Sequence, residues 1–117
     1  SDCTIAVFAG QSPLSNRVGL RLAADEMPAG ICTSSGTVGH SLSLGAADSV
    51  TVLADSAVLA DAAATRIGNK VGNGKEPREG VNRALEAATE INGIRGVLVI
   101  CAELLGASGR VELIPLD

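Results

Sequence analysis

The stretch Ile31–Gly45 holds residues whose types could do chemistry. It reads ICTSSGTVGHSLSLG, and it combines hydroxyl side chains and three glycines with His40, the single histidine of the chain. Glycine lets a backbone approach a ligand closely, while hydroxyls and free amides donate to phosphate or carboxylate oxygens. The P-loop pattern G-x-x-x-x-G-K-[ST] is absent. The stretch therefore indicates either an anion-binding loop with a proton-carrying histidine or an ordinary exposed connection.

Asp61 and Thr65 are the second pair of interest, because a spacing of four places both side chains on one face of a helix. A carboxylate and a threonine hydroxyl are hard oxygen ligands that suit Mg²⁺, although two ligands alone are too few. If this face is exposed, Asp61 is an ordinary solvated carboxylate. If it is partly buried, Asp61 needs a cation or hydrogen-bond donors to offset its desolvation. Arg66 follows and could serve a phosphate or only the surface.

A catalytic Ser-His-Asp set can also be written from these residues, with Ser34 or Ser35, His40, and Asp48 or Asp61. The G-x-S-x-G pattern of a nucleophile elbow is absent. Three such common residue types can be combined in this way in most chains, so the sequence does not favour this alternative.

The three cysteines are Cys3, Cys32 and Cys101. Their number is odd, no Cys-x-x-Cys pair occurs, and one histidine is too few to complete a usual zinc site. Cys32 and Cys101 lie in apolar runs, so we expect buried free thiols, with a reactive Cys32 as the alternative. The lack of a disulfide pattern favours a reducing cytoplasm.

The composition indicates a single folded domain over residues 1–117, because 46% of the residues are hydrophobic and only 19% are charged. Its core must be aliphatic, since aromatic residues make up 1%. The scarcity of aromatic side chains and the net charge of −4 argue against a nucleic-acid-binding module. No apolar run reaches the 18 to 20 residues of a membrane span.

Hydrophobic spacing predicts the elements that must position these residues. In the first half, four strands are expected, at Thr4–Ala9, Arg17–Leu22, Ile31–Ser34 and Ser49–Ala54. The first two should form a hairpin. A loop is expected at Ala24–Gly30, where Pro and Gly break the pattern.

The second half begins with helical spacing. Two helices are predicted, Ala57–Val71 with Asp55 or Ser56 as its cap, and Pro77 to about Ile91 with Asn92-Gly93 as its stop. Strands follow at Val97–Cys101 and Val111–Pro115, joined by a turn at Gly106–Gly109. The expected fold is α+β, with a mixed, largely antiparallel sheet and two helices packed on one face.

The string from Cys32 to Asn69, CTSSGTVGHSLSLGAADSVTVLADSAVLADAAATRIGN, resembles an uncharacterised ApbE-like family. This family is distantly related to the ApbE flavin transferases, which share the Thr-Ser-Gly loop, the histidine and an Asp-x-x-x-Thr helix. VFAGQSPLSNRVGLRL and GVLVICAELLGA resemble further segments of the same family, so the resemblance extends over nearly the whole chain.

The resemblance implies an α+β protein that transfers the FMN part of FAD to a threonine, or hydrolyses FAD, with Mg²⁺. Asp61 and Thr65 match the metal ligands, and His40 matches the active-site histidine. The residues that match the flavin or nucleotide site belong to the same loop; they are Thr33, Ser34, Ser35, Gly36, Thr37 and His40. Mg²⁺ would neutralise the charge that develops when the pyrophosphate breaks, and His40 would orient phosphate or move a proton.

Two departures from the family pattern define the alternative. After the histidine, flavin transferases continue into an Asp-Pro-x-x-Gly run, whereas this chain has Ser41-Leu42-Ser43-Leu44-Gly45. This favours a non-catalytic ligand-binding or accessory protein, with a role in sulfide assimilation into homocysteine. Family members also carry an N-terminal half of similar size that completes the pocket. The resemblance therefore implies that this chain is the C-terminal half of a longer protein. Its expected ligand is a nucleotide or flavin, and its expected protein partner is the N-terminal half or another copy of the chain.

Overall fold

The computed structural model describes residues 3–7, 17–22, 30–34, 49–71, 77–101 and 104–116. Within these ranges the chain forms strands and two helices. Their order is β1 Cys3–Ala6, β2 Val18–Leu22, β3 Gly30–Ser34, β4 Ser49–Ala54, α1 Ala57–Val71, α2 Pro77–Thr89, β5 Ile94–Cys101, β6 Leu104–Gly109 and β7 Glu112–Pro115. The expected α+β class is therefore confirmed.

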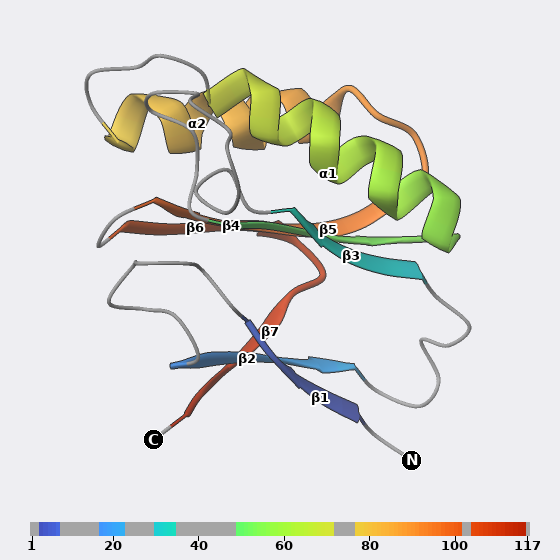
Figure 1. Cartoon of the computed structure of the whole chain (residues 1–117), viewed down its shortest axis with the longest axis vertical. Coiled ribbons are helices and arrows are strands. Elements are labelled where there is room, and N and C mark those ends of the chain that lie inside the picture. The colour runs from blue at the N-terminus through green and yellow to red at the C-terminus, as the bar shows by residue number, and fades with distance from the viewer. Residues whose placement is uncertain are drawn as a thin grey trace.

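The elements lie in three layers (Figure 1). The two helices cover one face of a four-stranded sheet with the order β3-β4-β5-β6, and a three-stranded sheet with the order β1-β2-β7 lies on the other side. Every described strand pair is antiparallel. The sequence predicted the helices on one face, but it did not predict that the strands divide into two sheets.

The larger core lies between the helices and the four-stranded sheet. Alternate residues of β4 and β5 supply its sheet side; they are Val50, Val52, Ala54, Val97, Val99 and Cys101. The helix side comes from the predicted stripes of small and apolar residues, including Ala60, Ala63, Ala64, Ile67, Val81, Ala84 and Ala88. These alanines allow a close approach, and α1 packs against α2, β3 and β4 at once.

A smaller core joins the two sheets. Leu98 and Ile100 of β5 point away from the helices and pack with Leu20 of β2 and with Val7, which directly follows β1. Ile31 of β3 is packed against the same cluster. Because side chains alternate along a strand, each residue of β3, β4 and β5 therefore faces either the helix layer or the small sheet.

Both helices begin at their predicted residues, Ala57 and Pro77. Of the two expected caps, Ser56 is the one observed, since its Oγ accepts a hydrogen bond from the Leu59 amide at 3.2 Å. The second helix ends at Thr89, two residues earlier than predicted. Gly93 then takes a φ of 89°, which suits the expected stop at Asn92-Gly93.

The predicted turn at Gly106–Gly109 is wrong, because Leu104–Gly109 is strand β6 and pairs with β5 along its length. Gly106 is small for a packing reason: a Cβ there would lie 2.4 Å from Cγ1 of Val81 on α2. Gly109, with a φ of 80°, has the backbone of a chain reversal, whereas Gly106 does not. Gly106 thus marks the point where this strand packs tightly against a helix.

The last strand, β7, pairs with β2 in the small sheet and not with a strand of the larger sheet. Gly30, expected in a loop, begins β3, where a Cβ would lie 2.1 Å from the carbonyl carbon of Ser56. In the described segments, no helix is long and apolar enough to cross a membrane.

Candidate functional site

Asp61 and Thr65 lie on the exposed face of α1, one helical turn apart. The residues between and around them that face the core are buried alanines, Ala60, Ala63 and Ala64. The hydroxyl of Thr65 donates to the backbone carbonyl of Asp61 at 3.2 Å, which fixes its rotamer. The helical spacing therefore brings a carboxylate and a hydroxyl oxygen to the same surface, as predicted, and the exposed alternative for Asp61 is the one observed.

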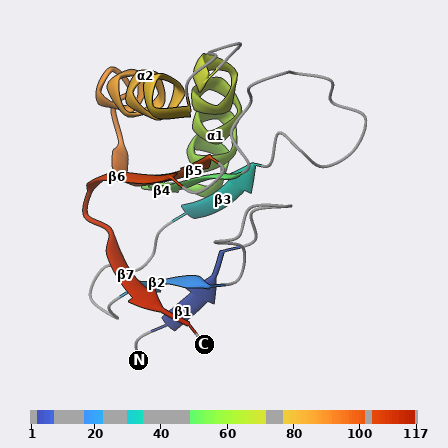
Figure 2. The same cartoon turned by 90° about the vertical axis from the view of Figure 1, so that its left-hand side faces the viewer.

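Helix α1 carries this surface along one edge of the four-stranded sheet. It packs against β3, the edge strand, while α2 packs against β5 and β6 (Figure 2). Cys32 lies on the helix side of β3, where it is packed against the larger core. Its Sγ donates a hydrogen bond to Oδ1 of Asp61 at 3.6 Å. The carboxylate is thus held between its own helix and the neighbouring strand.

Cys32 is half-buried, and its environment disfavours the thiolate. Burial raises the pKa of the Cys32 thiol above its ordinary value, and the hydrogen bond to Asp61 and the negative charge of that carboxylate raise it further. A protonated thiol is a poor nucleophile. The arrangement therefore makes Cys32 a hydrogen-bond donor at neutral pH and does not support the reactive-thiol alternative.

Thr33 lies on the opposite side of the same strand. Its register partner is Thr51 on β4, and the two hydroxyl oxygens are 2.9 Å apart. Thr51 in turn pairs with Leu98, which belongs to the core between the sheets. The hydroxyl of Thr33 consequently faces the small-sheet side and not the surface that carries Asp61.

Ser49 adds a second unusual hydroxyl to that side of β4. It is fully buried, and its Oγ has no hydrogen-bond partner among the described residues. Its register partner Ile100 packs in the core between the sheets. A buried hydroxyl without a partner normally costs free energy.

The remaining residues of the predicted loop site lie outside the described residues; they are Ser35, Gly36, Thr37 and His40. Asp48 also lies outside them. The backbone of Ser34 ends β3 and pairs with Val50. The roles predicted for His40, and the triad written from these residues, therefore remain predictions.

The Asp61 carboxylate and the Thr65 hydroxyl could supply two of the oxygen ligands of a magnesium ion. Its carboxylate can accept about four hydrogen bonds or ligand contacts, and the thiol of Cys32 occupies one of them. The Thr65 hydroxyl has already given its hydrogen to a carbonyl, so its oxygen can still act as a ligand. Mg²⁺ commonly uses one or two protein carboxylates, with waters and substrate phosphates completing its shell. Within the described ranges, no group of three or more His, Cys, Asp or Glu side chains could hold a metal ion.

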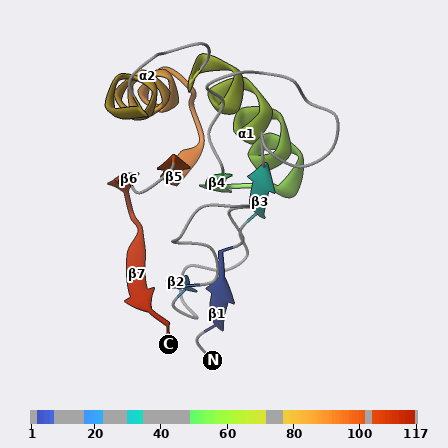
Figure 3. The same ribbon diagram turned by 60° about the vertical axis from the view of Figure 1, so that its left-hand side comes forward.

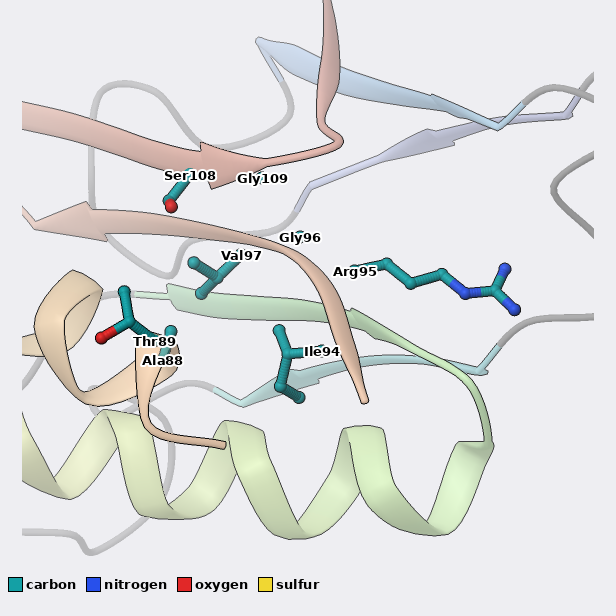
Figure 4. A pocket seen from close by; sticks show the side chains of 8 residues that line it. All are labelled: Ala88, Thr89, Ile94, Arg95, Gly96, Val97, Ser108 and Gly109. Atoms are coloured by element: carbon teal, nitrogen blue, oxygen red, sulfur yellow. The ribbon is translucent and has the colours of Figure 1, made fainter. Parts of the chain in front are cut away.

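A pocket of about 100 Å³ lies near the opposite edge of the four-stranded sheet (Figure 4). Residues from the end of α2, from β5 and from β6 line it; they are Ala88, Thr89, Ile94, Arg95, Gly96, Val97, Ser108 and Gly109. Arg95 points away from it and its Nε lies 2.8 Å from Oδ1 of Asp55. The Thr89 hydroxyl donates to the carbonyl of Glu86. Because β4 lies between β3 and the strands β5 and β6 that line this pocket, the pocket is distinct from the Asp61 surface.

The contact between Cys32 and Asp61 is the feature that sequence reasoning missed. Both residues were singled out, but for separate roles. Which strand lies beside the exposed face of α1 depends on sheet order, and residue spacing along the chain carries no signal for that. Strand alternation could only have indicated that Cys32 and Thr33 face opposite sides.

Comparison with known proteins places the chain in a family. The family model described as AbpE bacteria matches residues 1–113. A UPF0280 protein of Methanococcus maripaludis strain S2 is 49% identical over 99% of this chain and 47% of its own length. UPF0280 proteins of Methanocaldococcus jannaschii and Methanosarcina acetivorans are each 44% identical, over 99% and 94% of this chain and 48% and 42% of their own lengths. The chain thus spans about half the length of these relatives.

Proposed function

The chain belongs to the AbpE bacteria family, and we propose that it supplies the metal-binding part of a Mg²⁺-dependent site for FAD or a related nucleotide. The observation that carries the proposal is the shared surface of Asp61 and Thr65, which have the order and spacing of the metal-binding helix of the ApbE flavin transferases that this chain resembles. In the proposed activity, the FMN part of FAD is transferred to a threonine or released by hydrolysis.

Charge neutralisation is the chemistry that Mg²⁺ supplies at a pyrophosphate. The chain's own contribution is to hold the ligands. Asp61 presents a carboxylate on a helix that is anchored by buried alanines, and Thr65 presents an oxygen whose direction is set by its bond to the helix backbone. His40 is proposed to orient phosphate or to move a proton. Thr33 and Ser34 at the end of β3, followed by Ser35, Gly36 and Thr37, are the proposed nucleotide-binding residues.

A second candidate is a binding or accessory protein that holds a nucleotide without consuming it, with a role in sulfide assimilation. The run Ser41–Gly45 favours it, because the Asp-Pro run of flavin transferases does not occur there. The protonated, hydrogen-bonded state of Cys32 argues against sulfur chemistry at that thiol.

The test is to incubate the protein with FAD and Mg²⁺, with and without EDTA, and to follow AMP and FMN by chromatography. Release that EDTA abolishes supports the first candidate, and Asp61→Asn should remove it. Glu86→Gln is the matched control, because Glu86 is an exposed carboxylate on the other helix. If FAD binds in equilibrium dialysis but no AMP or FMN is released, the second candidate is favoured. If the protein neither binds FAD nor releases its products, both candidates are contradicted.

A further inference from the structure

We propose that Cys32 is a positioning residue for the Asp61 carboxylate, orienting it toward the bound metal; this inference rests on the proposed function. The two residues come from different elements, the edge strand β3 and the helix α1, and are 29 positions apart in the chain. Their contact is therefore a product of the fold and not of local helix geometry. No other hydrogen bond to the Asp61 side chain is found among the described residues.

An exposed aspartate on a helix is free to change rotamer, and ordering it costs entropy when a ligand binds. Cys32 lowers that cost because its own position is fixed. Its backbone is paired with Val52 of β4, and its side chain packs against the larger core. A bond from this anchored thiol to Oδ1 selects the rotamers of Asp61 that lean toward β3.

The chemistry of the donor suits this role. A thiol has one hydrogen to donate, so it engages one lone pair of Oδ1 and leaves Oδ2 available for a cation. Outer partners of this kind commonly orient the ligands of metal sites, and their loss weakens metal binding by about 10- to 100-fold. The simple alternative is that Cys32 only fills space between β3 and α1.

Substitutions at Cys32 separate these roles. Cys32→Val removes the donor and keeps an apolar side chain, about one methyl group larger than that of cysteine, while Cys32→Ser keeps a donor in a smaller side chain. Cys101→Ala is the matched control for loss of a thiol, because Cys101 is buried on β5, away from the β3 edge. Far-ultraviolet circular dichroism and urea midpoints establish that each variant is folded.

The measurement is titration with Mn²⁺, which shares the preference of Mg²⁺ for oxygen ligands, followed by electron paramagnetic resonance, with Mg²⁺ as competitor. Cys32→Val should raise the Kd by about 10-fold or more, whereas Cys32→Ser and Cys101→Ala should stay within about threefold of the parent. In the metal-free protein, the ¹³C resonance of the Asp61 carboxyl should shift in Cys32→Val and not in Cys101→Ala.

The outcomes distinguish the inference from the function on which it rests. If Asp61→Asn abolishes Mn²⁺ binding while Cys32→Val binds as tightly as the parent, the positioning role is overturned and the metal site stands. Equal weakening in Cys32→Val and Cys32→Ser also overturns it, because the donor would then be irrelevant. If Asp61→Asn binds Mn²⁺ like the parent, or the parent does not bind it, the metal site fails and the positioning role fails with it.

Discussion

Cys32 and Thr33 are neighbours on β3, yet their side chains contact different layers of the molecule. The thiol of Cys32 donates to Asp61 on α1, and the hydroxyl of Thr33 lies 2.9 Å from that of Thr51, on the side of the small sheet. Figure 3 shows these two layers, with α1 on one side of β3 and the small sheet on the other. Strand alternation separates them. A site built on the exposed face of α1 can therefore use Cys32 directly, whereas Thr33 can reach it only through its backbone.

The hydroxyl pair between Thr33 and Thr51 should contribute little to stability. Thr51 is 2% exposed, but Thr33 is exposed and can bond to water when its partner is lost. Thr51→Val keeps the shape of the side chain, so we expect the free energy of unfolding to fall by about 1 kcal/mol or less. Urea denaturation followed by circular dichroism measures it. A loss above about 2 kcal/mol would show that Thr33 cannot be solvated in this way.

Removing the buried hydroxyl of Ser49 should leave the protein as stable or more stable. The side chain is fully buried and its Oγ has no partner among the described residues, so the serine carries a desolvation cost without a compensating bond. Ser49→Ala should change the free energy of unfolding by between zero and about 1 kcal/mol in the stabilising direction. Thr51→Val on the same strand is the comparison. A clear destabilisation by Ser49→Ala would indicate that this hydroxyl has a partner.

Much of the helical layer could be predicted because its signals are local. The stripe from Ala60 to Ile67 has a period of 3.6 residues, and Pro77 suits the first turn of a helix. The order of strands within the sheets is a non-local property, so the pairing of β7 with β2 left no trace in spacing. Gly106 shows the same limit, since glycine indicates a turn in sequence but here makes room for α2.

For the site, spacing along one helix was sufficient to place Asp61 and Thr65 together. It was insufficient for contacts between elements. Nothing in the sequence indicates that β3, and not β6, lies beside the exposed face of α1, and so the bond from Cys32 could not be foreseen. Hydrophobic pattern fixes which side of an element is buried, but not which neighbour buries it.

The packing role of Gly106 gives a sharp prediction for stability. In Gly106→Ala the new methyl group would lie 2.4 Å from Cγ1 of Val81 and 3.1 Å from Cδ1 of Leu85. Either α2 must shift, or these two side chains must change rotamers. Overpacking of this kind costs about 1 to 3 kcal/mol. The loss should appear as a lower urea midpoint at unchanged slope.

Gly68→Ala is the matched control for Gly106→Ala. Gly68 lies within α1, and a Cβ there would meet only Cγ2 of Val50, at 3.9 Å, which is an ordinary contact. Alanine is favoured over glycine inside a helix by about 1 kcal/mol. The two Gly→Ala changes should therefore have opposite signs. Stabilisation by both would mean that α2 is not held closely against β6.

The environment of Cys32 also predicts how alkylation depends on pH. Because burial, the bond to Asp61 and the charge of Asp61 raise the thiol pKa, iodoacetamide should modify Cys32 with a midpoint above that of an unfolded thiol, about 8.5. Asp61→Asn removes the negative charge, so its midpoint should be lower than in the parent. Peptide mass spectrometry after timed labelling in EDTA reports Cys32 separately from the other cysteines. An unchanged midpoint in Asp61→Asn would contradict the contact.

The same shift makes stability depend on pH in a defined direction. A raised pKa means that the folded state keeps the Cys32 proton at a pH where the unfolded state has lost it. This contribution is complete below the unfolded pKa of about 8.5 and is lost as pH rises toward the folded value. Between pH 7.5 and 9.5, urea midpoints measured with reductant and EDTA should therefore fall more steeply for the parent than for Cys32→Ala. Equal slopes would mean that the Cys32 thiol titrates alike in both states.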